Sequence, residues 1–116
     1  MQDSIKKHLH DILIAANSIF EYLGEKRDFD EYESNKLIRR AVEREFEIIG
    51  EATNRILKIE KEFPIENAER IISLRNYVIH GYDKVDNVII WGVISRDLPK
   101  LKKEVEDLLK PNIQTP

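Results

Sequence analysis

The chain has 116 residues, which suits one domain with a core of its own. Hydrophobic residues make up 41% and charged residues 35% of it; there is no cysteine, so disulfides, thiolate metal sites and thiol nucleophiles are excluded. The net charge of −3 argues against a protein that coats nucleic acid electrostatically, but it allows a local basic cleft. Because no apolar run approaches the roughly 20 residues of a membrane span and the N-terminus lacks a signal core, we expect a cytoplasmic protein.

The first predicted helix covers about residues 5–23. Its apolar residues recur at helical spacing and form one stripe: Ile5, Leu9, Ile12, Leu13, Ala16, Ile19, Phe20 and Leu23. Asp3 or Ser4 is suited to cap its start, and Gly24 is suited to a left-handed C-terminal cap. The charged segment 25–33 that follows is predicted to be a connection that can hold one helical turn.

A second, longer helix is predicted from about Ser34 to Lys61. Its stripe consists of Ile38, Ala41, Val42, Ile49, Ala52, Ile56 and Ile59, with Phe46 and Ile48 at the margin. Glu45 falls inside that stripe, and Gly50 interrupts it at a cost of about 1 kcal/mol relative to alanine. We expect the close approach of another backbone to offset this cost.

The remaining sequence predicts two more helices. One is short, from about Asn67 to His80, and the other begins near Asp86 or Asn87 and continues to about residue 109. Asp97-Leu98-Pro99 is expected to kink or restart the last helix, because proline fits a first helical turn. The sequence therefore predicts an all-α, antiparallel up-down bundle of four main helices as a single domain over 1–110, followed by a flexible tail over 111–116.

Reactive side chains are concentrated at the end of the short helix, where an arginine, an amide, a histidine and a tyrosine lie within eight residues. Arg75 falls at the edge of the apolar face, so it needs a carboxylate partner, for which Glu45 and Glu51 are candidates. Asn76 and His80 are four residues apart and share a face. Arg75 and His80 lie about 140° apart around a helix, so they reach one phosphate only if the arginine curls round or a second subunit contributes.

These groups suit phosphoryl-transfer chemistry. An imidazole titrates near neutrality, and a guanidinium stabilises developing negative charge. The structural alternative is an arginine paired to a core glutamate together with a histidine that caps a helix, and spacing alone does not decide between the two. His8 and His10 lie on the first helix and are expected at the surface, and no cluster shows metal-ligand spacing.

Arg75-Asn76, followed by His80 and then Gly81-Tyr82, resembles the Arg-x-x-x-x-His-x-Tyr signature of the HepT-like family within the HEPN superfamily. Two further blocks, within residues 41–52 and 85–101, resemble the second and last helices of that family. The likeness covers residues 38–109 and a compatible first helix. The segment 63–67 lacks the tryptophan expected there, which bears on packing more than on chemistry.

The resemblance implies a homodimeric, HEPN-like helical protein that acts as a metal-independent endoribonuclease toxin without cofactors. It implies an MntA-type minimal nucleotidyltransferase as antitoxin, which silences the toxin by transferring AMP to the motif tyrosine, here Tyr82. By position, Arg75 and His80 would be catalytic and Asn76 supporting, with Glu51 a supporting partner for the arginine. Two alternatives stay open: a non-catalytic HEPN module that binds a nucleotide or a partner, and a structural assembly partner of the nucleotidyltransferase.

Overall fold

The computed structural model describes residues 1–66, 71–74, 76–77 and 86–110, and within these ranges every regular element is helical. The all-α prediction is therefore confirmed. The elements are α1 (Asp3–Leu23), α2 (Phe29–Ser34), α3 (Lys36–Ile59), α5 (Asn87–Gly92), the π-helical turn η2 (Val93–Asp97) and α6 (Leu98–Leu109). Residues 71–74 and 76–77 are also helical, which agrees with the part of the predicted third helix that can be described. No helix in these ranges is long and apolar enough to cross a membrane.

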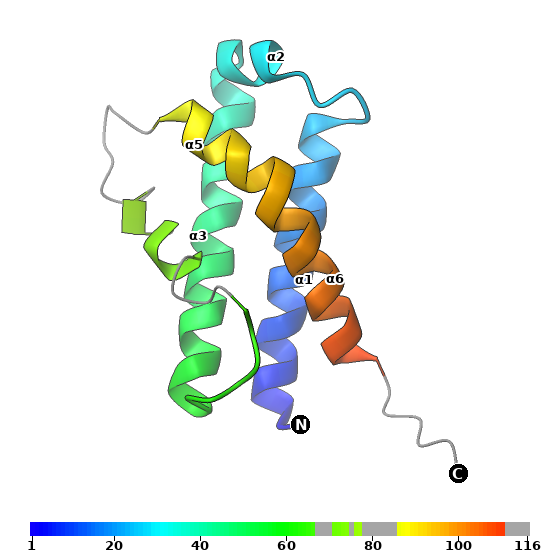
Figure 1. The fold of residues 1–116 in the computed structure, drawn as a ribbon, viewed down its shortest axis with the longest axis vertical. Helices are drawn as coiled ribbons and strands as arrows, with labels where there is room; N and C mark the ends of the chain where they lie inside the picture. Colours follow the sequence, from blue (N-terminus) through cyan, green and yellow to red (C-terminus); the bar gives the residue numbers. More distant parts are fainter. Residues whose placement is uncertain (67–70, 75, 78–85, 111–116) are drawn as a thin grey trace.

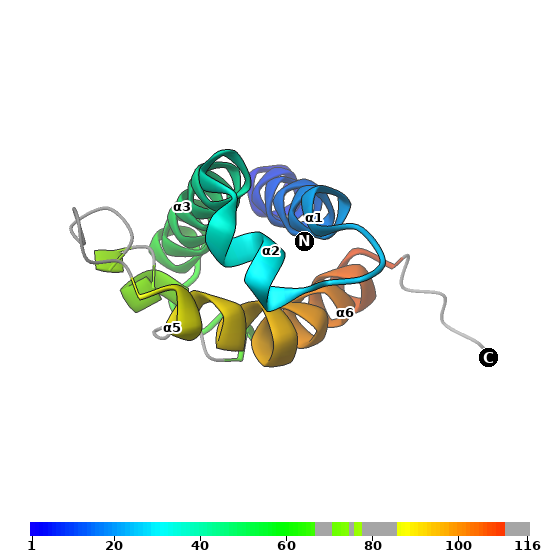
Figure 2. The same cartoon turned by 90° about the horizontal axis from the view of Figure 1, so that it is seen from above.

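The helices form two layers. The long helices α1 and α3 pack side by side and run in opposite directions (Figure 1). The α5, η2 and α6 segments follow one another across one side of this pair, and α2 lies over its end (Figure 2). The antiparallel order of the first two main helices is thus as expected. The up-down order of all four stays a prediction, because much of the third lies outside the described residues.

The predicted apolar stripes form the core, with some corrections on α3. Phe46 was placed at the margin of the stripe but is only 3% exposed, whereas Ile59 at the end of the helix is 39% exposed. The buried acid is Glu43, whose Oε1 lies 3.3 Å from Nη1 of Arg40. Glu45 is half-buried instead, and its Oε2 accepts a hydrogen bond of 2.7 Å from the Tyr22 hydroxyl of α1.

The ends of the helices show how local chemistry sets their bounds. The prediction that Asp3 or Ser4 caps α1 was wrong, because the helix already begins at Asp3 and its N-cap, Gln2, makes no side-chain capping bond. Gly24 ends α1 with a φ of 69°, as predicted, and its N–H donates to the Phe20 carbonyl. The side chain of Asn35 caps α3 by accepting a 3.1 Å hydrogen bond from the N–H of Ile38.

The helical turn predicted within the connection 25–33 is confirmed, because α2 begins at Phe29, and this helix anchors the second layer. In α2, Tyr32 is 1% exposed and its ring centroid lies 5.3 Å from that of Trp91 in α5. Phe29 meets the same indole edge to face at 5.7 Å. These aromatic contacts fix the position of α5 and of the turn that follows it.

The last helix restarts without breaking. Asp86 caps α5 by accepting a 2.8 Å hydrogen bond from the N–H of Val88. After the π-helical turn η2, α-helical hydrogen bonding resumes at Leu98, with Pro99 in the first turn. The core residues Ile90, Ile94 and Leu98 are spaced by four and four, which would drift by about 40° per step around an ideal α-helix. The wider π-turn takes up this drift and keeps all three facing the core.

Candidate functional site

The structure describes only part of the predicted site. Arg75, His80 and Tyr82 lie outside the described residues, so their roles stay predictions. Asn76 is placed in a helical segment and is exposed, which leaves it accessible to a substrate. Glu51 lies on α3 with its side chain 45% exposed, and its Oε1 accepts a 2.6 Å hydrogen bond from Nη2 of Arg55.

The carboxylates proposed as partners of Arg75 have described partners of their own. Glu51 pairs with Arg55, one turn further along α3, and Glu45 accepts from Tyr22. Arg75 lies outside the described residues, so its pairing with either acid stays a prediction. The two contacts do show that both acids contribute to the scaffold itself.

Two residues join the ends of the segment that carries the histidine and tyrosine of the motif. The Tyr77 hydroxyl accepts a hydrogen bond from the backbone N–H of Asp86, the residue that also caps α5. Residues 77 and 86 therefore lie together, with 78–85 between them in the chain. Leu74 is 8% exposed in the core and anchors the same helical segment. The two flanks of the motif are thus fixed to the core and to α5.

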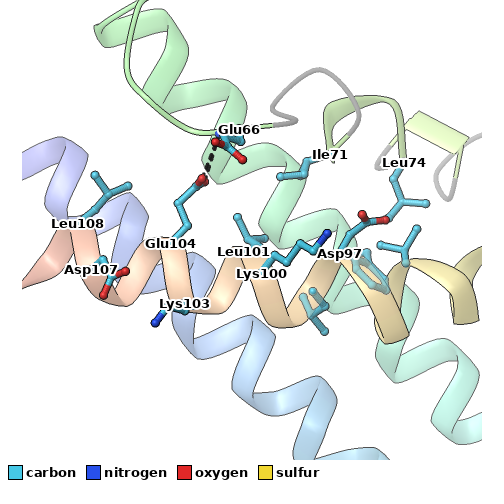
Figure 3. A pocket seen from close by; sticks show the side chains of 13 residues that line it. Glu66, Ile71, Leu74, Asp97, Lys100, Leu101, Lys103, Glu104, Asp107 and Leu108 are labelled. Atoms are coloured by element: carbon cyan, nitrogen blue, oxygen red, sulfur yellow. Dashed lines mark hydrogen bonds between the residues drawn. The ribbon is translucent and has the colours of Figure 1, made fainter.

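Two hollows flank this segment, and Leu74 and Val93 line both of them. We call the larger one, of about 530 Å³, the acidic cavity. Apolar side chains of four segments line its interior, and the charged groups among its described lining residues are four carboxylates and two ammonium groups (Figure 3). The carboxylates belong to Glu66, Asp97, Glu104 and Asp107, and the ammonium groups to Lys100 and Lys103.

A hydrogen bond ties one side of the acidic cavity to the other. The backbone N–H of Glu66 lies 3.2 and 3.3 Å from the two carboxylate oxygens of Glu104, so the chain after α3 is held to α6 (Figure 3). Burial raises the pKa of the Glu104 carboxyl above its ordinary value, an effect that this N–H partly offsets. Among the described lining residues, carboxylates outnumber ammonium groups, an arrangement that disfavours an RNA phosphate.

We call the second hollow, of about 500 Å³, the Arg96 groove. It lies between the helical residues 71–74 and 76–77 and the α5–η2 segment, and its described lining residues are Ser73, Leu74, Tyr77, Val88, Ile89, Gly92, Val93 and Arg96. Arg96 is exposed, and its Nε lies 3.4 Å from the carbonyl oxygen of Gly92. Within the described ranges, no carboxylate lies at ion-pair distance from its guanidinium. The described part of the groove therefore combines apolar walls, two hydroxyls and one cation.

Sequence reasoning missed two features: the hydrogen bond between Asp86 and Tyr77, and the position of Arg96 in the groove. Asp86 was recognised as a helix start, but its backbone contact with Tyr77 depends on how two helices dock. Arg96 gave no signal, because its place in the groove depends on how the α5–η2 segment packs against residues 73, 74 and 77. The spacing of four and four in the apolar stripe was the one usable indication of the π-turn.

Comparison with known proteins bears on the family of the chain. The sequence model of the family described as Ribonuclease HepT-like matches residues 5–108. A protein of Methanocaldococcus jannaschii named as a candidate RNase is 41% identical over 88% of this chain and 94% of its own length. A second protein of that organism, with the same kind of name, is 35% identical over 91% of both chains. A protein of Thermococcus cleftensis named as a probable ribonuclease HepT is 34% identical over 95% of this chain and all of its own.

No solved structure matches the chain at a comparable significance. The evidence for the family is therefore the sequence match, which runs from the first turns of α1 to the end of α6. The all-helical architecture agrees with the fold that the Arg75–Tyr82 motif led us to expect. The chain belongs to the HepT-like ribonuclease family.

Proposed function

We propose that the chain is a metal-independent endoribonuclease that acts as the toxin of a toxin–antitoxin pair in the cytoplasm. The observation that carries this proposal is the family match over residues 5–108 together with an intact Arg75, His80 and Tyr82 at the signature spacing. Candidate-RNase and HepT names among the relatives support the same activity. Residues 1–110 would form its single domain, with 111–116 as a tail.

In the proposed reaction, RNA supplies its own nucleophile. The ribose 2′-oxygen attacks the adjacent phosphorus and loses its proton to a general base, while the 5′-oxygen leaves and takes a proton from a general acid. The products are a 2′,3′-cyclic phosphate and a 5′-hydroxyl. His80 serves as base or acid, since an unperturbed imidazole has a pKa of about 6.5. Arg75 donates a fork of N–H bonds to the charged phosphoryl oxygens, and Asn76 orients the imidazole or a phosphate oxygen.

A homodimer supplies the second histidine. One chain carries a single histidine in the motif, and Arg75 and His80 lie about 140° apart on the predicted helix. Across a shared cleft, the His80 of one protomer acts as base and that of its partner as acid. The same cleft brings an arginine toward the histidine of the other chain.

Silencing follows from the motif tyrosine. Transfer of AMP to the Tyr82 hydroxyl by an MntA-type nucleotidyltransferase adds bulk and a negative charge where an RNA phosphate must bind, so the modified chain repels its substrate. We expect the intact mass to rise in steps of one AMP when the chain is produced with that partner, and to stay constant for Tyr82→Phe. A wild-type mass that does not change would refute the modification while leaving the nuclease proposal intact.

The proposed nuclease is tested by cleavage of single-stranded RNA in the presence of EDTA. We expect His80→Ala to lower the cleavage rate at least about 100-fold, because a positioned general acid or base contributes that much. His10→Ala is the matched control, since His10 is exposed on α1 and should leave the rate unchanged. Product termini should carry a 2′,3′-cyclic phosphate.

Two outcomes would count against the nuclease. Full cleavage by purified His80→Ala protein, with contaminating nuclease excluded, would remove the histidine from the mechanism. RNA or nucleotide binding without any cleavage by the wild-type chain would favour the non-catalytic binding module instead.

A further inference from the structure

We infer that the Arg96 groove is an RNA subsite, in which Arg96 binds a backbone phosphate and the apolar walls receive the base of a nucleotide flanking the cleaved bond. This inference rests on the proposed ribonuclease function and assigns it a substrate-binding residue outside the signature motif. It concerns single-stranded RNA, whose unpaired bases are free to enter a groove.

The Arg96 side chain belongs to the π-turn η2, and its guanidinium packs beside Gly92. Arg96 and Asp97 are consecutive residues of η2, yet Arg96 lines the Arg96 groove and Asp97 lines the acidic cavity. The arginine folds back over Gly92: Nε lies 3.4 Å from the Gly92 carbonyl, and a Cβ added at Gly92 would lie 3.3 Å from Nη2. The absence of a side chain at residue 92 therefore leaves room for the guanidinium beside the groove.

The groove lies next to the catalytic motif in the chain. Ser73 and Tyr77 line it, and they bracket Arg75 at two residues on either side. On a helix of 3.6 residues per turn, position 80 falls within about 20° of position 73. Were the helix to continue to His80 as the sequence predicts, the histidine would fall on the face that borders the groove.

Charge selects the occupant. The guanidinium has no acidic partner among the described residues, and a phosphate provides the bidentate acceptor that its geometry suits. The exposed side chains of Val88 and Ile89, 65% and 50% accessible, supply apolar surface for a base beside that phosphate. A second copy of the chain would have to bring a carboxylate to Arg96, because a buried guanidinium without a counter-charge is costly.

The experiment separates binding from chemistry. Binding of a fluorescein-labelled single-stranded RNA is measured in the His80→Ala background, and cleavage kinetics are measured in the otherwise wild-type chain. We expect Arg96→Gln to raise the Kd and the KM by about five- to tenfold, with kcat within about twofold. The slope of log K against log salt should fall by about 0.7, as for one lost phosphate contact on a single strand. Lys103→Gln is the matched control. This exposed lysine lines the acidic cavity, so its substitution should change neither the Kd nor the salt slope.

A second variant keeps the charge and moves its position. Gly92→Ala places a methyl group against the Arg96 head, while alanine favours the helix, so this variant should fold and still bind RNA about two- to threefold less tightly. Unchanged Kd and salt slope in both Arg96→Gln and Gly92→Ala would overturn the subsite, and so would a change of oligomeric state in Arg96→Gln. Normal cleavage with no Arg96 effect rejects the subsite alone, whereas Arg96-dependent binding without cleavage rejects the nuclease and retains the subsite.

Discussion

The acidic cavity and the Arg96 groove have nearly the same volume, about 530 and 500 Å³, and they share a wall formed by Leu74 and Val93. Their charged groups nevertheless differ in sign. Among the described residues, carboxylates outnumber ammonium groups in the first, whereas Arg96 is the one charged side chain that lines the second. The comparison shows that two hollows of similar size can differ in the sign of their described charges, and this difference is why we assign the proposed RNA phosphate to the Arg96 groove.

Two adjacent residues of η2 illustrate this difference. Arg96 lines the Arg96 groove and Asp97 lines the acidic cavity, because consecutive residues of a helix project in different directions. Because Leu74 and Val93 line both hollows, removal of this shared wall should merge them.

Among the variants that test the difference between the two hollows, Leu74→Ala is expected to have the largest effect, because it removes part of the wall that they share. Leu74 is 8% exposed, so its truncation should lower the free energy of unfolding by about 2 to 3 kcal/mol, measured by urea denaturation. Leu37→Ala is the control, because Leu37 is 80% exposed and should cost under about 0.5 kcal/mol. Equal, small losses for both variants would show that Leu74 does not anchor the motif helix to the core.

The smallest effect concerns the pH response of the acidic cavity. Burial raises the pKa of Glu104 in the folded state, so its contribution to stability is fully present below the ordinary value of 4.5 and is lost as the pH rises through the raised pKa. We expect the stability of Glu104→Gln relative to the wild type to be higher at pH 7 than at pH 4. Glutamine keeps an acceptor for the Glu66 N–H but carries no charge at either pH. Urea midpoints measured across this pH range check the difference.

Glu106→Gln is the matched control for that measurement, because Glu106 lies exposed on the same helix. Its stability difference from the wild type should not vary in the same window. A pH-independent difference for Glu104→Gln would mean that its carboxyl is not perturbed by the cavity.

Much of the scaffold was predictable because helical periodicity depends on local spacing. The stripes of α1 and α3, the glycine that ends α1 and the restart at Leu98-Pro99 all follow from residues within a few positions of one another. The errors have the same origin. Spacing alone placed Phe46 at the margin, but its large ring reaches the core from there.

The sequence by itself determined the helical class, the family and the signature of Arg75, His80 and Tyr82, because these depend on residue identity and order. Tertiary structure alone decided that Tyr77 meets Asp86, that α2 fixes α5 through Trp91, and that consecutive residues of η2 serve two hollows. The physical reason is that contacts between helices depend on how their surfaces interlock, and a π-turn arises from that packing rather than from local preference. The charge of the Arg96 groove is accordingly a property of the fold.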